Sequence, residues 1–197
     1  TGEGGMVVTK RRELYDRMRI MALHGLSRDA WARYSGGGSW DYQIVAPGFK
    51  YNLTDIAAAV GVQQLNRAEA MRCERERVAV RYIESLGSLD ELEMPPNPPN
   101  RIHAWHLFPI RLCLDKLTID RTKLLDALRK SGIGFSVHWR PLNLHPYYES
   151  CGWLPEHCPF AGKTWTRLVS LPIFPGMTTE ELNHVIETIQ SLCAAHK

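Results

Sequence analysis

The sequence predicts a fold between the α/β and α+β classes, ending in a small α+β domain. Three observations support this prediction: helical periodicity dominates the N-terminal half, proline and asparagine dominate residues 94–100, and strand and helix patterns alternate after them. A proline-rich run can neither continue a helix nor pair as a central strand. We therefore expect residues 1–94 to end one domain, residues 95–100 to be a linker, and residues 101–197 to form a second domain.

The N-terminal part is expected to contain a strand, a helix, a long loop and a long helix. Residues 5–8 are a short apolar and β-branched run, which predicts a strand. Thr9 can cap a helix that Gly25 ends, because apolar residues recur between them at helical spacing. Residues 27–48 contain a glycine-rich run and no sustained period, which predicts a loop.

The long helix is expected to begin after Thr54 as its N-cap and to run to about Leu86. Its first half carries an apolar stripe, whereas its second half is mostly charged. This pattern predicts burial for the first half and solvation for the second.

The C-terminal part reads as strand, helix, strand, strand, helix. Residues 103–112, 134–139 and 168–174 are rich in aromatic and β-branched side chains and predict the strands. Asp120 is placed to cap the first helix. The run 178–181, Thr-Thr-Glu-Glu, is a capping box that predicts the start of the last helix.

Composition is that of an ordinary globular protein, with 44% hydrophobic and 23% charged residues. The formal net charge of +3 is too small and too dispersed to indicate nucleic acid, although it modestly favours an anionic small ligand. No apolar run approaches the roughly 18 residues of a membrane-spanning helix. We therefore expect neither a nucleic acid nor a membrane as a partner.

The cysteines and the known catalytic motifs exclude several other classes. Five cysteines, odd in number and widely scattered, indicate a reduced cytoplasmic protein. Cys151, His157 and Cys158 lack a convincing fourth ligand and the usual zinc-finger spacing, so we expect no metal. Residues 2–5 lack the context of a dinucleotide or P-loop motif, and the sequence holds no nucleophile elbow, zinc-protease motif or kinase signature.

Six motifs occur in order along almost the whole chain. They are TGEGGMVVT at 1–9, LHG at 23–25, APGFKYNLTDIAAAVGVQQL at 46–65, HAWHLF at 103–108, GIG at 132–134 followed by HWRPL at 138–142, and SLPIFPGM at 170–177. In this order they resemble the DegT/DnrJ/EryC1/StrS family of pyridoxal-phosphate-dependent nucleotide-sugar aminotransferases. The resemblance implies the C-terminal part of a fold-type I aminotransferase, in a homodimer or higher oligomer whose active sites are each assembled from both subunits.

The resemblance also implies the chemistry of a parent protein. In this family the lysine that binds pyridoxal 5'-phosphate lies a few residues upstream of the TGEGG run, so the catalytic residue is expected before Thr1 and the chain alone is expected to be inactive. The parent would move an amino group from glutamate to a nucleotide-linked ketosugar, for cell-surface polysaccharides or natural products. Two alternatives stay open: a pyridoxamine-phosphate-dependent sugar dehydratase of the same family, with histidine in place of the lysine, and a non-catalytic dimerisation or ligand-binding domain.

Lys50 and Asn52 are the candidate cofactor-binding residues. The family commonly has Gly-Tyr-Asn-Tyr-Arg at this segment, with an asparagine that reaches the phosphate of the partner subunit's cofactor. Here Lys50 stands at the asparagine position and Asn52 at the arginine position. Both side chains can donate to a phosphate. The alternative without ligand binding is a solvent-facing lysine and an asparagine that belongs to a turn. Because the neighbouring helix would pack on the large domain and the partner subunit, the chain alone is expected to expose apolar surface and to associate.

Four further residues are candidates for substrate binding. His138 resembles the family position that approaches the nucleotide-sugar diphosphate, and His145 and Tyr147 follow on the same loop. His24 ends the first helix near the glycine loop and could border the site, although a cation at a helix C-terminus explains it equally. Of the remaining histidines, His103 and His106 are expected on opposite faces of a strand, which excludes a shared metal.

Overall fold

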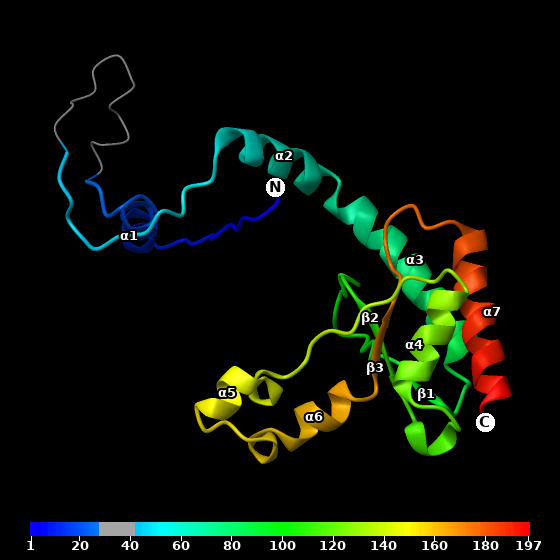
Figure 1. The fold of residues 1–197 in the computed structure, drawn as a ribbon. Helices are drawn as coiled ribbons and strands as arrows, with labels where there is room; N and C mark the ends of the chain where they lie inside the picture. Colours follow the sequence, from blue (N-terminus) through cyan, green and yellow to red (C-terminus); the bar gives the residue numbers. More distant parts are fainter. Residues whose placement is uncertain (28–41) are drawn as a thin grey trace. The chain divides into compact units, whose positions relative to one another are not determined.

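The computed structural model describes residues 1–27 and 42–197. The described chain divides into two compact units, Thr1–Arg67 and Ala68–Lys197, here called the N-terminal and the C-terminal unit (Figure 1). The glycine-rich run predicted to form part of a loop falls outside the described residues. None of the helices in the described part of the chain is long and apolar enough to span a membrane.

The C-terminal unit is built on a three-stranded antiparallel sheet. Strands β1 (Leu92–Glu93), β2 (Phe108–Leu112) and β3 (Leu168–Leu171) lie in the order β1-β2-β3. In the register Leu92 pairs with Leu112, and Phe108 pairs with Leu171. Burial alternates along β2, so that Phe108, Ile110 and Leu112 all enter the core from one face, as the period of a strand requires.

Three helices complete this core: α3 (Ala68–Leu86), α4 (Arg121–Lys130) and α7 (Thr179–Ala195). Figure 1 shows α4 and α7 beside the sheet, and α7 packs on both α3 and α4. The Tyr82 ring lies 4.9 Å from that of Phe108, and its hydroxyl donates to the Pro172 carbonyl at 2.9 Å. Burial raises the pKa of Tyr82, so this hydroxyl keeps its proton at neutral pH.

The predicted caps of both C-terminal helices are confirmed. Asp120 Oδ1 accepts from the Lys123 amide at 2.8 Å. Thr178 and Glu181 form a complete capping box on α7, in which each side chain accepts from the other residue's amide. Short helical elements make up the rest of the unit: η2 (Leu114–Lys116), η3 (Leu142–Leu144), α5 (Pro146–Ser150), η4 (Pro155–His157) and α6 (Pro159–Trp165).

The long helix predicted over 54–86 is two helices, and the burial prediction for its halves is wrong. Helix α2 (Asp55–Asn66) has Arg67 as its C-cap, and α3 begins at Ala68. No residue of α2 is buried, whereas Val78, Ala79, Tyr82 and Leu86 of α3 belong to the core. The many charged residues of α3 misled the prediction, because a few apolar residues at helical spacing among them are enough to pack the helix in the core.

The division into compact units also differs from the predicted domain boundary. The chain divides after Arg67, and not at the proline-rich segment 95–100. The reason is that α3 and β1, both before that segment, pack on elements that follow it. The assignment of the remaining N-terminal residues to a cofactor-binding domain stays a prediction.

The predicted strands are shorter in the structure, each for a local reason. The run 5–8 is exposed and forms no strand. Trp105 adopts a left-handed φ of 46° and its amide donates to His103 Nδ1, so β2 begins only at Phe108 and the alternation expected for His103 and His106 does not apply. Strand β3 stops before Pro172, which has no amide for the ladder. The segment 134–139 forms only the isolated bridge between Ser136 and Ser170.

The N-terminal unit holds α1 (Arg12–Ala22) and α2. Helix α1 begins three residues after Thr9, and the Thr9 hydroxyl instead accepts from the Arg11 amide at 3.1 Å. At its end the Gly25 amide donates to the Ile20 carbonyl at 3.0 Å with a left-handed φ of 71°, as the predicted glycine stop requires. Neither helix buries a residue.

Candidate functional site

Two regions carry the predicted site residues, one in each unit. In the N-terminal unit a sharp turn after α1 folds the chain back on residues 43–51. Gly25 stands at the closest approach, because a Cβ there would lie 1.7 Å from the Ala46 carbonyl oxygen. Only glycine accommodates both this contact and the left-handed backbone. The turn therefore depends on the identity of one residue.

Backbone hydrogen bonds then align the returning segment with the end of α1. The His24 amide donates to the Phe49 carbonyl at 2.8 Å, the Phe49 amide to Met21 at 2.7 Å, and the Tyr51 amide to Ala22 at 2.8 Å. Leu23 and Lys50 form a bridge within this ladder. The ladder brings His24 next to the segment that carries Lys50. The assignment of His24 to substrate binding stays a prediction.

Lys50 and Asn52 are both exposed and lie directly before α2. Thr54 is the predicted N-cap, and its hydroxyl accepts from the Ala57 amide at 3.3 Å. Other first-turn amides of a helix have no acceptor within it and carry the positive end of the macrodipole. A cation, an amide donor and a helix N-terminus thus meet over five residues, which is a chemistry suited to phosphate.

The glycine-rich N-terminus lies on the same part of the unit. The space beside Gly4 is occupied by Leu53, and the space beside Gly61 of α2 is occupied by the Thr1 side chain, whose Cγ2 would lie 3.3 Å from an added Cβ. Residues 1–4 therefore contact the segment that follows Asn52 and the body of α2. The N-terminal segment therefore packs beside the candidate anchor.

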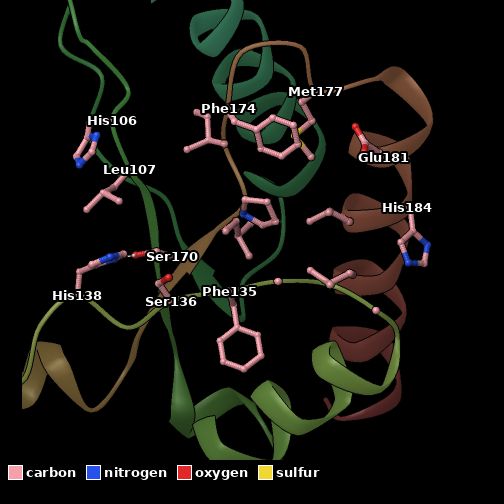
Figure 2. A pocket seen from close by; sticks show the side chains of 17 residues that line it. His106, Leu107, Phe135, Ser136, His138, Ser170, Phe174, Met177, Glu181 and His184 are labelled. Carbon is pink, nitrogen blue, oxygen red and sulfur yellow. Dashed lines mark hydrogen bonds between the residues drawn. The ribbon is translucent and has the colours of Figure 1, made fainter. Parts of the chain in front are cut away.

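In the C-terminal unit His138 opens onto a cavity of about 560 Å³. The cavity lies between the segment 132–138, the end of β3 and helix α7 (Figure 2). Phe135, Phe174 and Met177 supply apolar walls, and His106, Ser136 and His138 line it from the side away from α7. An apolar hollow with a few polar groups at one side is the usual form of a small-molecule site.

Ser170 holds the His138 ring. Its buried hydroxyl lies 2.9 Å from His138 Nδ1, the contact drawn as a dashed line in Figure 2. The bridge with Ser136 fixes the backbone of Ser170 through bonds of 2.8 and 3.1 Å. Because a hydroxyl can donate or accept, this contact is compatible with a proton on Nε2 in both neutral and charged imidazole. His138 can then donate from Nε2 to an anion.

Two polar side chains on the α7 side of the cavity are committed to the fold. Glu181 closes the capping box of α7, and His184 Nε2 donates to the Ser131 carbonyl at 2.8 Å. Neither is left to bind a ligand without breaking a structural contact. Of the remaining polar side chains, His106, Ser136 and His138, the last has its ring held in place by Ser170 and is the ligand candidate that the sequence predicts.

His145 and Tyr147 are not part of that cavity. His145 precedes α5 and is half-buried, and Tyr147 on α5 is 71% exposed. Their assignment to substrate binding stays a prediction. Among the described residues no group of three or more side chains is arranged to hold a metal ion.

Sequence reasoning missed Ser170, although a signal was present. Ser170 interrupts the apolar run Leu168–Leu171, and a polar residue inside such a run is an informative exception because burial of a hydroxyl requires a partner. The stacked rings of Phe49 and Tyr51, 4.8 Å apart on either side of Lys50, were also missed. No periodic signal marks that pair.

Comparison with known proteins agrees with this reading. The model of the DegT/DnrJ/EryC1/StrS aminotransferase family matches residues 1–190. The chain is 43% identical to the uncharacterized protein MJ1066 of Methanocaldococcus jannaschii over 198 residues, covering 100% of this chain and 51% of that protein. It is 38% identical to the spore coat polysaccharide biosynthesis protein SpsC of Bacillus subtilis over 194 residues, covering 98% and 50%. The chain thus spans about half the length of the curated relatives it matches.

Solved structures agree with the family. The putative sugar aminotransferase Spr1654 of Streptococcus pneumoniae in its PMP form is 28% identical, with a TM-score of 0.82 over 97% of this chain and 47% of that one. Its PLP form gives 27% identity and a TM-score of 0.81. The predicted fold class, the C-terminal part of a fold-type I aminotransferase, is confirmed by these matches. The chain belongs to the DegT/DnrJ/EryC1/StrS aminotransferase family.

Proposed function

We propose that these residues are the C-terminal part of a pyridoxal-phosphate-dependent aminotransferase that moves an amino group from glutamate to a nucleotide-linked ketosugar. The chain supplies phosphate anchors for the cofactor through Lys50 and Asn52, and part of the sugar-nucleotide surface through His138. The covalent attachment of the cofactor and the proton transfer belong to a lysine upstream of Thr1. The family membership and the Spr1654 structures with PLP and PMP support the cofactor assignment.

The observation that carries this proposal is the ladder that presents Lys50 and Asn52 in front of α2. Three backbone hydrogen bonds hold the segment without using either side chain. Both side chains remain exposed, and Thr54 keeps the helix start in place. An exposed cation held by its backbone beside a helix N-terminus fits a phosphate dianion.

Each candidate site residue has its own role in this proposal. Bound pyridoxal phosphate supplies the electron sink for amino transfer. Lys50 offsets the charge of its phosphate, and Asn52 adds an amide donor. His138, oriented by Ser170, donates from Nε2 to the substrate's diphosphate, and His24, His145 and Tyr147 are placed around the substrate.

The apolar surface of the N-terminal unit supports a second subunit in the proposal. Ile56 and Leu65 of α2 are 83% and 75% exposed. Exposed apolar surfaces of this kind are usually covered by association. We assign α2 and the segment before it to contacts with the rest of the parent protein and with a partner subunit.

Titration with pyridoxal phosphate tests the anchor in the complete protein. Lys50→Ala is expected to lower the affinity for pyridoxal phosphate about tenfold to hundredfold, because a charge-assisted contact contributes roughly 1.5 to 3 kcal/mol. Asn52→Ala is expected to cost less if lysine is the main anchor. Lys130→Ala is the matched control, since Lys130 is an exposed lysine of the other unit. Unchanged affinity in both test variants would show that the segment is only structural.

A second experiment tests the inactivity of the 197 residues. The chain is mixed with pyridoxal phosphate, reduced with borohydride and mapped by mass spectrometry. No stoichiometric adduct is expected on its seven lysines, Lys10, Lys50, Lys116, Lys123, Lys130, Lys163 and Lys197. A single fully modified lysine would contradict the placement of the catalytic residue upstream. Sedimentation of the same chain is expected to show a dimer or higher oligomer.

A further inference from the structure

Two arginines lie over one tryptophan ring in the C-terminal unit. The guanidinium carbon of Arg121 is 4.8 Å from the centroid of the Trp165 ring, and that of Arg140 is 5.6 Å from it. Arg121 also donates to the Trp165 carbonyl, which ties the first residue of α4 to the end of α6. Stacking on an aromatic face restricts a guanidinium group to one plane.

Neither guanidinium group has an anionic partner in the part of the chain that the structure describes. Within residues 1–27 and 42–197, no carboxylate forms an ion pair with Arg121 or Arg140. Arg129 provides the contrast, since it lies 5.3 Å from the Phe135 ring but also binds Asp126 at 2.6 Å. Two like charges over one ring repel each other, and burial lowers the pKa of Arg121. A bound anion would offset the repulsion between these two charges.

Arg140 also lies close to the candidate ligand residue His138. Only Trp139 separates them in the sequence, so their Cα atoms are at most about 7 Å apart. The Arg140 side chain is exposed, and its contact with Trp165 leaves its N–H groups in one plane without a protein acceptor among the described residues. The planar fork of a guanidinium matches two phosphate oxygens at once.

We infer that Arg140, which lies over the Trp165 ring as Arg121 does, binds the diphosphate of the nucleotide-linked substrate together with His138. The inference rests on the proposed function, because it takes its ligand from there. It adds a specificity-determining residue that recognises the diphosphate and not the sugar or the base. Trp165 is a positioning residue, since it acts through the guanidinium that it stacks against.

Binding of uridine diphosphate and inorganic pyrophosphate to the complete protein, loaded with pyridoxal phosphate, tests this inference by calorimetry. Pyrophosphate reports on the site without presuming a base, and uridine is the control ligand without phosphate. Arg140→Ala is expected to lower the affinity for both phosphate ligands about tenfold or more and to leave the affinity for uridine unchanged. Arg140→Lys is expected to restore only part of the affinity, because lysine keeps the charge and loses the planar fork.

Two further variants separate stacking from charge. Trp165→Leu is expected to lower the affinity for pyrophosphate by less than Arg140→Ala does. It is also expected to make pyrophosphate binding more sensitive to salt, because the guanidinium of Arg140 then acts as a less ordered charge. Arg129→Ala removes an arginine that also lies over an aromatic ring but is already paired, and it is expected to leave the affinity unchanged. Circular dichroism checks that each variant is folded.

The outcomes distinguish this inference from the function on which it rests. If His138→Ala weakens both phosphate ligands and Arg140→Ala does not, the inference is overturned and the proposed function stands. If Arg129→Ala weakens pyrophosphate as much as Arg140→Ala, the effect is one of general charge and the inference is also overturned. If the unmodified protein binds neither ligand, the nucleotide-sugar proposal and the inference fail together.

Discussion

The two units of this chain use similar residues in opposite ways. In the C-terminal unit, Phe108, Ile110 and Leu112 of one strand are completely buried. In the N-terminal unit, α1 and α2 bury no residue, and only Leu26 and Ala46 among its described apolar side chains reach the interior. One unit is closed by its own side chains, whereas the other is shaped mainly by its backbone.

This difference shows which surfaces are completed within the chain. The C-terminal unit has a sheet, three helices that pack in its core, and one contiguous core cluster. The N-terminal unit has a tight glycine turn and a ladder of hydrogen bonds, which fix the path of the backbone without generating a core. Hydrophobic burial is the dominant stabilising contribution in folding, so the N-terminal unit is expected to depend on contacts with other surfaces.

The largest expected effect compares a core residue with an exposed one. Phe108→Ala in the C-terminal core is expected to lower the free energy of unfolding by about 3–5 kcal/mol, because it removes a fully buried ring and leaves a cavity. Ile56→Ala on α2 is the control and is expected to change it by less than about 0.5 kcal/mol. Urea unfolding measures both values. Equal changes in the free energy of unfolding would contradict the difference in burial between the two units.

A second prediction uses the cysteines as probes. Cys193 is buried on α7, and burial raises the pKa of its thiol to about 11. Since the thiolate is the reactive form, its alkylation by iodoacetamide at pH 8 is expected to be about a hundredfold slower, or more, than that of exposed Cys73. Mass spectrometry follows each site, and urea is expected to abolish the difference. Similar rates in native buffer would show that the C-terminal core opens readily.

A third prediction compares two threonine caps. Thr178→Ala is expected to lower the free energy of unfolding of the C-terminal unit by about 1 kcal/mol, because α7 loses its capping box. Thr54→Ala removes the corresponding hydroxyl bond of α2, which contributes to a helix outside that core. It is expected to reduce helical circular dichroism slightly and to leave the urea midpoint of the C-terminal unit unchanged. A shared shift in midpoint would mean that the units unfold together.

The smallest expected effect is a pH dependence at the edge of the sheet. Glu93 on β1 accepts from Arg111 Nε at 2.9 Å, and this contact lowers the pKa of the carboxyl group. A lowered pKa in the folded state adds stability above the ordinary value near 4.3, and that stability is lost as the pH falls further. The pair is partly exposed, so the contribution is expected to be about 0.5 kcal/mol or less.

Glu93→Gln tests this contribution through urea unfolding between pH 3 and pH 7. The variant is expected to lose stability at neutral pH and to show a flatter acid limb than the unmodified chain. Glu149→Gln on α5 is the control, because Glu149 forms no ion pair among the described residues. An identical acid limb in all three chains would exclude a role for the pair.

Local signals were the reliable part of the sequence analysis. Thr54, Asp120 and Thr178 cap the helices that they were predicted to cap, and Gly25 ends α1. These predictions succeeded because each depends on a hydrogen bond or a dihedral angle within a few residues. Family membership could also be predicted, because the six ordered motifs are recognised in the sequence without any knowledge of packing.

Burial and strand length were the weak part. The charges of α3 suggested solvation, yet Tyr82 and Leu86 on its other face complete the core. The left-handed backbone at Trp105 shortened β2, and no feature of composition announces it. For α3 the outcome depends on residues far away in the sequence, which periodicity within one segment does not describe.

The sequence by itself determined the family, the class of cofactor and the local positions of Lys50, Asn52 and His138 relative to the elements around them. Only the tertiary structure decided that Ser170 orients His138 and that Trp165 carries two arginines. It also decided that α3 belongs with the C-terminal core while α2 stays uncovered. The physical reason is range: caps, turns and motifs are local interactions, whereas burial and side-chain pairing require two distant segments to be brought together.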